Sequence, residues 1–407
     1  MKIIEGGVTA AKGFEAAGIA AEIKYKGRSD MAMVYSQKPC QAAGAFTTNV
    51  VKAAPVKWDQ KIVKESAYAQ AVVVNSGIAN ACTGEEGYGY CKETANKVSD
   101  VLGIPADAVL VGSTGVIGMQ LPIERIKTGV EKLAMAKCDS IEAGTEAAKA
   151  IMTTDTCKKE IAVELTIDGK TVTIGGMAKG SGMIHPNMCT MLSFITTDAA
   201  ISKSALQKAL SADVEDTYNM ISVDGDTSTN DTVLVLANGM AGNDEIISDG
   251  EAFESFMKAL NTVTVHLCRM IAGDGEGATK LLECIVSGAD SEETAVTVSK
   301  SVICSSLFKA AMFGADANWG RVLCAIGYSG ADVDVTKIDV SFKSSAGTIE
   351  VCKNGAGIDF SEEIAKEILI QDEIQVLINL NSGDVSATAW GCDLTYDYVK
   401  INGDYRT

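Results

Sequence analysis

The sequence contains few of the residues that build metal and redox sites. Only two histidines occur in 407 residues, His185 and His266, which disfavours a histidine-rich metal centre. The twelve cysteines are scattered, and no C-x-x-C pair occurs among them. Free cysteines prefer protein interiors. We therefore expect buried, reduced thiols, as in a cytosolic protein, and no histidine-rich metal site.

Basic residues and long apolar runs are also scarce. The 53 Asp and Glu residues outnumber the 35 Lys and Arg residues, and the net charge of -18 would repel nucleic acid and anionic membranes. No window reaches the roughly 18 apolar residues that a membrane span requires. Residues 1–7 lack the apolar core of an export signal. We expect a cytoplasmic protein whose partners are small cationic or zwitterionic molecules.

What is present describes a compact globular chain. Hydrophobic residues make up 47% of the sequence and aromatic residues only 5%, which excludes a disordered protein. Predicted strands and helices interleave without strict alternation, which indicates an α+β fold of packed β-sheets with outer helices. Length alone suggests two or three domain-sized units, although no repeat or linker marks a boundary between them.

Periodicity and turn residues predict the individual elements. Helices are expected at residues 50–69, 84–102, 121–136, 140–152, 202–213, 248–269, 292–312 and 361–370. Strands are expected at 19–25, 71–74, 108–111, 191–197, 232–237, 333–351, 373–380 and 385–397, with a hairpin over 161–174 around Asp168-Gly169. A hairpin or meander is expected over 6–35, with 19–25 as its clearest strand. The segments 75–80, 112–118 and 313–321 are expected to be loops, and the tail 400–407 would by default be frayed.

One stretch near the middle of the chain has the clearest chemical meaning: Lys179–Leu192, KGSGMIHPNMCTML. It begins where the predicted hairpin ends. Its glycines and Pro186 favour a tight turn, and the strand predicted at 191–197 follows directly. This arrangement places the hydroxyl group of Thr190 at the head of a strand.

A threonine hydroxyl is a poor nucleophile unless a base lies beside it. Cleavage of the Cys189–Thr190 bond would give Thr190 its own α-amine, whose reference pKa of about 7.7 to 8.0 allows it to accept and return a proton. Attack of the Thr190 hydroxyl on the Cys189 carbonyl would convert the peptide bond to an ester, and hydrolysis would complete the cut. We predict an α chain, residues 1–189, and a β chain, residues 190–407.

Two glycine-rich segments give weaker signals. The segment 112–118 could direct backbone N–H groups and the Thr114 hydroxyl at an oxyanion, although most such turns are structural. The spacing in 273–279 matches no nucleotide-binding loop.

The acidic run 224–231 invites a calcium interpretation that its spacing does not support. Counted from Asp224, the sixth position is Thr229 and the twelfth is Val235, where a calcium loop requires Gly and Glu. We expect a polar turn at the edge of the active site, with Asp224 and Asp226 as supporting residues.

Together these motifs resemble the ornithine acetyltransferase family, the glutamate N-acetyltransferases of arginine biosynthesis. The central stretch resembles the family's cleavage motif, and further matches are GSTGVIG at 112–118, TTDT at 153–156, DGDTSTND at 224–231, GDGEGAT at 273–279, NWGR at 318–321 and the ending 398–407. The chain departs from the family at Cys189, where alanine is usual. Both residues are small, so we expect cleavage to occur.

The resemblance implies a self-cleaving, N-terminal-nucleophile-like acyltransferase. Thr190 would take the acetyl group of N-acetylornithine and pass it to glutamate, with acetyl-CoA as a further candidate donor and no cofactor. The two pieces would stay together as a heterotetramer of two α and two β chains. The implied roles are oxyanion stabilisation by Thr114 and Gly115, and substrate binding by Thr153, Lys179, Thr190, Glu276, Asn402 and Thr407.

Some alternatives remain open at this stage. The charge of Lys179 suits either a substrate carboxylate or tuning of the Thr190 amine. A self-cleaving aminopeptidase or amidohydrolase would use Thr190 equally well, with water as the acceptor. In a metabolite-binding protein, Thr190 would be an ordinary strand residue.

Overall fold

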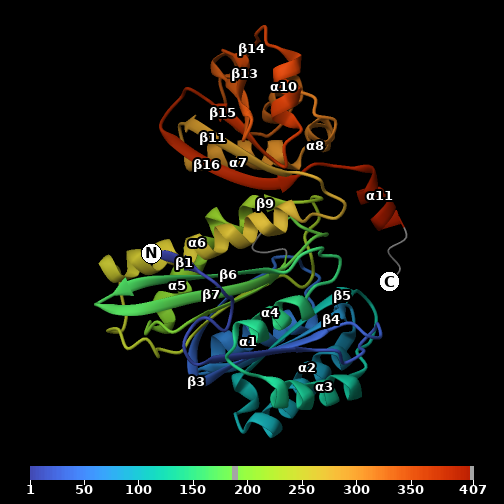
Figure 1. Ribbon diagram of the computed structural model, residues 1–407, viewed down its shortest axis with the longest axis vertical. Helices are drawn as coiled ribbons and strands as arrows, with labels where there is room; N and C mark the ends of the chain where they lie inside the picture. The colour runs from blue at the N-terminus through green and yellow to red at the C-terminus, as the bar shows by residue number, and fades with distance from the viewer. Residues whose placement is uncertain (186–190, 404–407) are drawn as a thin grey trace. The chain divides into compact units, whose positions relative to one another are not determined.

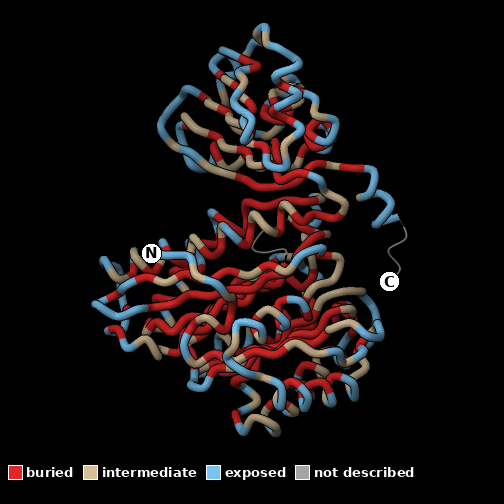
Figure 2. Tube along the Cα trace, viewed as in Figure 1, coloured by how far each residue is buried: buried red, intermediate tan, exposed pale blue. Residues whose placement is uncertain are grey.

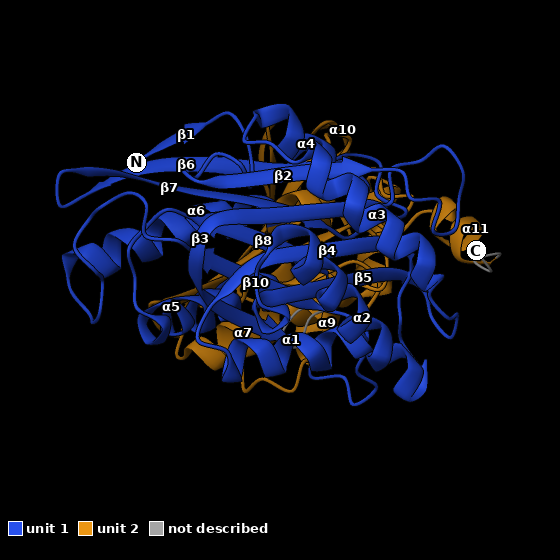
Figure 3. Ribbon diagram, turned by 90° about the horizontal axis from the view of Figure 1, so that it is seen from below, with its two compact units in different colours: residues 1–180, 186–219, 227–267 blue, residues 181–185, 220–226, 268–407 orange. Residues whose placement is uncertain are grey.

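The structure is a computed structural model that describes residues 1–185 and 191–403. The chain forms two compact units (Figure 3). Unit 1 comprises 1–180, 186–219 and 227–267, and unit 2 comprises 181–185, 220–226 and 268–407. The predicted cleavage position, 189/190, lies outside the described residues.

In the described part of unit 1, nine strands form one sheet in the order β1-β6-β7-β8-β10-β3-β4-β5, with β2 paired to β3. Figure 1 labels β1, β3, β4, β5, β6 and β7 of this sheet. Their bounds are β1 Lys2–Ile4, β2 Phe14–Ile19, β3 Met31–Phe46, β4 Ala69–Ile78, β5 Val109–Val116, β6 Lys159–Ile167, β7 Lys170–Lys179, β8 Leu192–Thr197 and β10 Thr232–Ala237. The β8–β10 and β4–β5 pairs are parallel. Chain segments far apart in sequence therefore end at neighbouring positions of one sheet.

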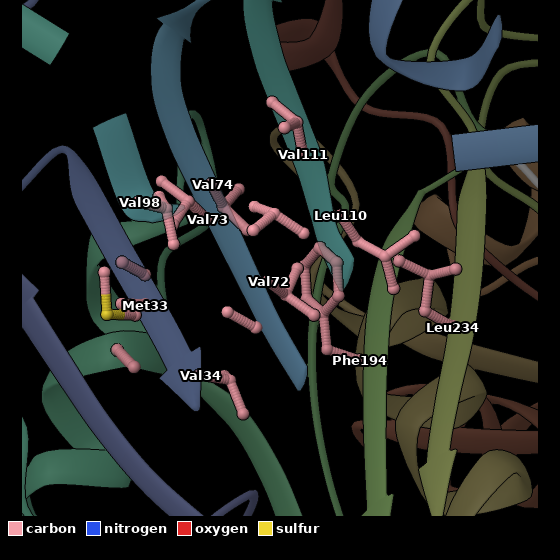
Figure 4. Close-up of a cluster of buried hydrophobic side chains, with 14 of the residues drawn as sticks. Met33, Val34, Val72, Val73, Val74, Val98, Leu110, Val111, Phe194 and Leu234 are labelled. Carbon is pink, nitrogen blue, oxygen red and sulfur yellow. The ribbon is translucent and has the colours of Figure 1, made fainter. Parts of the chain in front are cut away.

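The helices of unit 1 pack on this sheet. They are α1 Ala54–Glu65, α2 Gly84–Leu102, α3 Ile123–Ala136, α4 Ile141–Ala150 and α5 Lys203–Asp216. Helices α1 and α2 contact β5, whereas α3 and α4 contact β2 and β3. Buried aliphatic side chains of β3, β4 and β5 meet Phe194 of β8 and Leu234 of β10 in the core (Figure 4). The strands that carry this core are buried along most of their length (Figure 2).

Unit 2 is built on a second sheet, ordered β14-β13-β12-β15-β11-β16-β9. Its strands are β9 Ile221–Ser222, β11 Leu281–Ala289, β12 Asp339–Ser344, β13 Gly347–Lys353, β14 Ala356–Gly357, β15 Glu373–Asn379 and β16 Val385–Cys392. Its helices are α7 Glu292–Cys304, α8 Ser306–Phe313, α9 Trp319–Gly327, α10 Glu362–Leu369 and α11 Tyr396–Gly403. Helix α6, Glu251–Gly273, contains residues of both units.

Many of the predicted elements are confirmed, for physical reasons visible in the sequence. The β6–β7 hairpin turns at Asp168 and Gly169, whose φ angles of 51° and 72° are the left-handed values that a two-residue turn needs. Serine hydroxyls cap several helices by accepting from the N–H group three residues on: Ser140, Ser202, Ser291, Ser305 and Ser361. The interleaved helices and sheets form the α+β architecture that the sequence predicts.

Other predictions of local structure were wrong. The helix predicted at 292–312 is two helices, because extended backbone at Ser305 (φ -69°, ψ 109°) ends α7 while its hydroxyl caps α8. The loop predicted at 313–321 contains the start of α9, which the Asn318 side chain caps. The strand predicted at 385–397 ends at Cys392, and part of the tail forms helix α11. Residues 19–25, predicted to be the clearest strand of 6–35, lie mostly between β2, which ends at Ile19, and β3, which begins at Met31.

Among the described residues, no single helix is both long and apolar enough to cross a bilayer. Helices α7 and α8 meet that test only as a pair bent by 57°.

Candidate active site

The predicted site residues are distributed over both units. Thr114, Gly115, Thr153 and Lys179 belong to unit 1, whereas Glu276 and Asn402 belong to unit 2. Three further predicted residues, Cys189, Thr190 and Thr407, lie outside the residues that the structure describes.

In unit 1 the carboxylate of Asp155 brings Thr153 and Lys179 together. Lys179 ends β7 and is only 7% exposed, and its Nζ lies 3.8 Å from Asp155 Oδ2. The same oxygen accepts from the Thr153 backbone N–H at 2.9 Å. The other oxygen, Oδ1, accepts from the Lys159 ammonium at 2.8 Å and from the Gly180 N–H at 2.7 Å. Two predicted substrate-binding residues therefore share one anchor.

The carboxylate of Asp155 interacts with two ammonium groups, those of Lys159 and Lys179. Burial alone would raise the pKa of Asp155, but the neighbouring charges of Lys179 and Lys159 outweigh it and hold the pKa well below its usual range. The carboxylate is therefore ionised at neutral pH, with an ammonium group on either side. Among these three described side chains, two ammonium groups accompany one carboxylate, which favours an anionic group of a ligand.

A third acid, Asp231, lies close enough for the charge of Lys179 to affect it. It is 1% exposed, and its Oδ2 has no hydrogen-bond partner among the described residues. Burial raises the pKa of Asp231 well above its usual range, although the hydroxyls of Ser228 and Thr47 and the charge of Lys179 oppose the shift. A raised pKa favours the neutral form of the Asp231 carboxyl group.

Thr114 and Gly115 lie at the end of β5, where its pairing with β4 becomes irregular at Gly77 and Ile78. Gly115 has φ 127°, and an added Cβ atom would lie 2.2 Å from the Gly77 carbonyl carbon, so only glycine fits. The segment was predicted to be a loop, as was 75–80, but both strands continue through Val116 and Ile78 because they pair with each other. Both residues are half-buried, which keeps them accessible to a ligand.

In unit 2, Glu276 and Asn402 contact each other directly. The Asn402 side-chain amide donates to Glu276 Oε2 at 2.7 Å. Glu276 is 7% exposed, and its backbone N–H donates to the Ser181 carbonyl at 2.9 Å. An added Cβ atom at Gly182 would lie 2.4 Å from the Glu276 carboxyl carbon. Glycine is therefore required at position 182, the second glycine of KGSG, because the Glu276 carboxylate occupies the space of a side chain. A carboxylate here suits the amino group of a ligand.

Asp224 holds the turn that leads into the central motif. Its carboxylate accepts from the backbone N–H groups of Met183 and Ile184, both at 2.7 Å, and from the Tyr398 hydroxyl at 3.1 Å. Met183 has φ 57°, a strained value that these contacts stabilise. Burial, followed by the charges of Asp224, Glu276 and Asp226, raises the pKa of Tyr398, so this hydroxyl stays a proton donor.

His185 is better explained as a turn residue than as a base. Its Nδ1 lies 3.1 Å from Ser222 Oγ and 3.5 Å from Cys304 Sγ. Burial, and then the charge of Lys300, lower its pKa. Within the part of the chain that the structure describes, no three His, Cys, Asp or Glu side chains are grouped to hold a metal ion.

Sequence reasoning missed the roles of Asp155, Lys159 and Asp231. Asp155 belongs to the TTDT motif and Asp231 to the DGDTSTND motif. The aspartate in each motif was the available signal. Their partners could not be identified, because Lys179 meets Asp155 only when β6 and β7 pair.

Known proteins resemble this chain over nearly all of its length. The ArgJ family matches residues 15–407. The arginine biosynthesis bifunctional protein ArgJ 1 of Clostridium acetobutylicum is 55% identical over 396 residues, or 97% of this chain and 96% of that protein. The arginine biosynthesis bifunctional protein ArgJ of Caldanaerobacter subterraneus subsp. tengcongensis is 52% identical over 407 residues, all of both chains.

A solved structure from Bacillus halodurans, described as arginine biosynthesis bifunctional protein argJ, matches with 48% identity and a TM-score of 0.51. The match covers 99% of that chain but only 53% of this one. The solved chain is therefore about half as long as this chain.

Proposed function

This chain belongs to the ArgJ family, and we propose that it works through an acetyl-Thr190 intermediate formed after self-cleavage. It is an acyltransferase of arginine biosynthesis that moves the acetyl group of N-acetylornithine to glutamate. The observation that carries this conclusion is the family match over residues 15–407, which includes every motif quoted above. The acetyl-enzyme, the cleavage and the residue roles are our proposal.

Self-cleavage at Cys189–Thr190 would expose the Thr190 α-amine as a base beside its own hydroxyl. The proposal is supported by the Bacillus halodurans chain, whose match covers 53% of this chain, because residues 190–407 also make up slightly more than half of it. The tight turn that Asp224 holds at Met183 and Ile184 immediately precedes the proposed cleavage segment.

The proposed reaction has two acyl-transfer steps. The Thr190 hydroxyl loses its proton to the α-amine and attacks the acetyl carbonyl, and the resulting oxyanion accepts from the Thr114 hydroxyl and the Gly115 N–H. The C–N bond breaks, ornithine leaves with the proton, and an acetyl ester remains on Thr190. The amine of glutamate then attacks the ester, and N-acetylglutamate leaves as Thr190 recovers its proton.

We propose a substrate group for each charged cluster. The cluster around Lys179, with Thr153 on the same carboxylate, suits the substrate carboxylate. The Glu276 carboxylate, oriented by Asn402, suits an amino group. Thr407 is proposed as a further substrate-binding residue from the resemblance alone.

Denaturing electrophoresis and N-terminal sequencing test the cleavage. Active enzyme should give two bands, and a second sequence should begin Thr-Met-Leu-Ser. The Thr190→Ala variant should remain one full-length, inactive band, whereas Thr171→Ala, at an exposed position of β7, should cleave and react normally. Transferase activity in an uncleaved chain would remove Thr190 from the mechanism.

Transfer of labelled acetyl from N-acetylornithine to glutamate tests the reaction itself, and release of acetate instead would indicate a hydrolase. A parallel assay with acetyl-CoA and glutamate tests the further proposal that acetyl-CoA is a second donor, which the word bifunctional in the relatives' names supports. We also propose a cytoplasmic heterotetramer of two α and two β chains, which the native mass would check.

A further inference from the structure

The side-chain amide of Asn230 joins two backbone segments beside the oxyanion pair. Its Nδ2 donates to the Ser113 carbonyl at 2.8 Å and to the Ala79 carbonyl at 2.6 Å. Its Oδ1 accepts from the Thr229 hydroxyl at 2.7 Å, which fixes the orientation of the amide. Asn230 is 7% exposed, so water does not compete effectively for these bonds.

These two carbonyls fix both sides of Thr114–Gly115. Ser113 immediately precedes the pair in the chain. Ala79 in turn donates its N–H to the carbonyl of Val116 at 3.0 Å, and Val116 immediately follows the pair. The dipeptide is therefore held before and after by contacts that meet at one amide.

The same amide continues a pattern along the free edge of β5. The Trp58 indole N–H donates to the Val109 carbonyl at 2.9 Å, and the Val111 N–H donates to Asp59 Oδ1 at 2.8 Å. Asn230 binds the carbonyl of Ser113, the next residue of β5 whose backbone groups point to this edge. Alternation along a strand makes Gly115 the following member of this row. Each side chain thus holds an edge group in register, up to the residue whose N–H would face the oxyanion.

We propose that Asn230 is a positioning residue for acetyl transfer, holding the Thr114 hydroxyl and the Gly115 N–H where the oxyanion forms. The inference rests on the proposed function, in which those two groups stabilise the oxyanion. Preorganised donors accelerate acyl transfer only where they are aimed at the developing charge. Loss of the amide would therefore lower the rate of the chemical step more than it lowers substrate binding.

Asn230→Ala tests this role, and Asn238→Ala is its matched control. Asn238 is also 7% exposed and also donates Nδ2 to a backbone carbonyl, that of Lys12 at 2.9 Å, but beyond the opposite end of β10. The values of kcat and KM for acetyl transfer should be measured per cleaved chain, together with Tm. Asn230→Ala should lower kcat about 10- to 100-fold and change KM by less than about 3-fold. Asn238→Ala should lower Tm and retain kcat within about 2-fold.

Equal kcat values in the two variants, or a loss confined to KM, would overturn the inference. If Asn230→Ala does not fold, Thr229→Val removes only the bond that orients the amide, and Thr229→Ser retains it. The Val variant should then lose about 3- to 10-fold in kcat and the Ser variant should recover it, whereas equal activity would count against the role. If the unaltered enzyme transfers no acetyl group, the proposed function itself fails, before Asn230 is considered.

Discussion

The carboxylate of Glu276 leaves no room for a side chain at Gly182, since an added Cβ atom would lie 2.4 Å from its carboxyl carbon. Gly182→Ala should therefore displace the carboxylate and break its bond with Asn402. We expect KM for N-acetylornithine to rise about 10-fold, because a change of that size corresponds to the loss of one hydrogen bond to a charged group. Steady-state kinetics measure this. Gly89→Ala, where nothing lies within 4 Å of the added atom, should leave KM unchanged.

Asp155 is the residue on which the cluster with Lys159 and Lys179 depends. Asp155→Asn would leave Lys159, whose side chain is fully buried, without its carboxylate partner. Breaking such a pair on one side costs about 3–5 kcal/mol, so urea unfolding should show a loss of that size at pH 7. The pKa of Asp155 is lower in the folded than in the unfolded protein, so the ionised carboxylate stabilises the fold. This stabilisation is fully present above the unfolded pKa and is lost as pH falls through the folded pKa. A variant as stable as the parent at pH 7 would contradict this account.

A role for a single residue can be proposed from the sequence alone where a motif contains its own chemistry. The proposal for Thr190, which stays a prediction, needs only its hydroxyl and the peptide bond to its own amine. Asp231 and Asn230 could not be interpreted in this way, because the charge that acts on Asp231 and the carbonyls that Asn230 binds belong to distant parts of the chain.

At the scale of elements, helix α5 contains a buried acid that makes stability depend on pH. Asp213 is 2% exposed, and burial raises its pKa to about 6, against hydrogen bonds from Asn261, Thr264 and Thr217. As pH rises from about 4 to 6, the unfolded carboxyl group ionises while the folded one stays protonated. The folded state should lose about 2–3 kcal/mol over this range through Asp213.

Asp213→Asn removes this titration. Urea unfolding of parent and variant at pH 4, 5, 6 and 7 should show the stability of the parent falling relative to the variant as pH rises, with the change complete near the folded pKa of about 6. Parallel stability curves would show that Asp213 does not titrate as described.

Elements with strong local signals were predictable from the sequence, and elements set by tertiary pairing were not. The ends of β4 and β5 contain Gly77, Gly112 and Gly115, which locally favour loops, yet each strand continues because the other supplies its hydrogen bonds. Conversely, the break at Ser305 divides a segment whose periodicity is helical on both sides.

For the whole molecule, the sheet of unit 1 combines strands from both sides of the proposed cut. Strands β8 and β10 follow position 190, and every other strand of that sheet in the described residues precedes it. They lie side by side in the sheet, with β8 paired to β7 and β10 paired to β3. All residues of β8 and β10 are buried. The proposed β chain therefore inserts two strands into the interior of a sheet otherwise built by the α chain.

This interleaving predicts that cleavage does not separate the chains. Without denaturant, cleaved enzyme should elute from gel filtration as one species containing both fragments, and denaturant should be needed to part them. Residues 190–407 expressed alone should aggregate, because β8 and β10 would expose apolar faces and unpaired backbone edges. Coexpression with residues 1–189 should prevent this. Fragments that elute separately under native conditions would show that the sheet does not hold the two chains together.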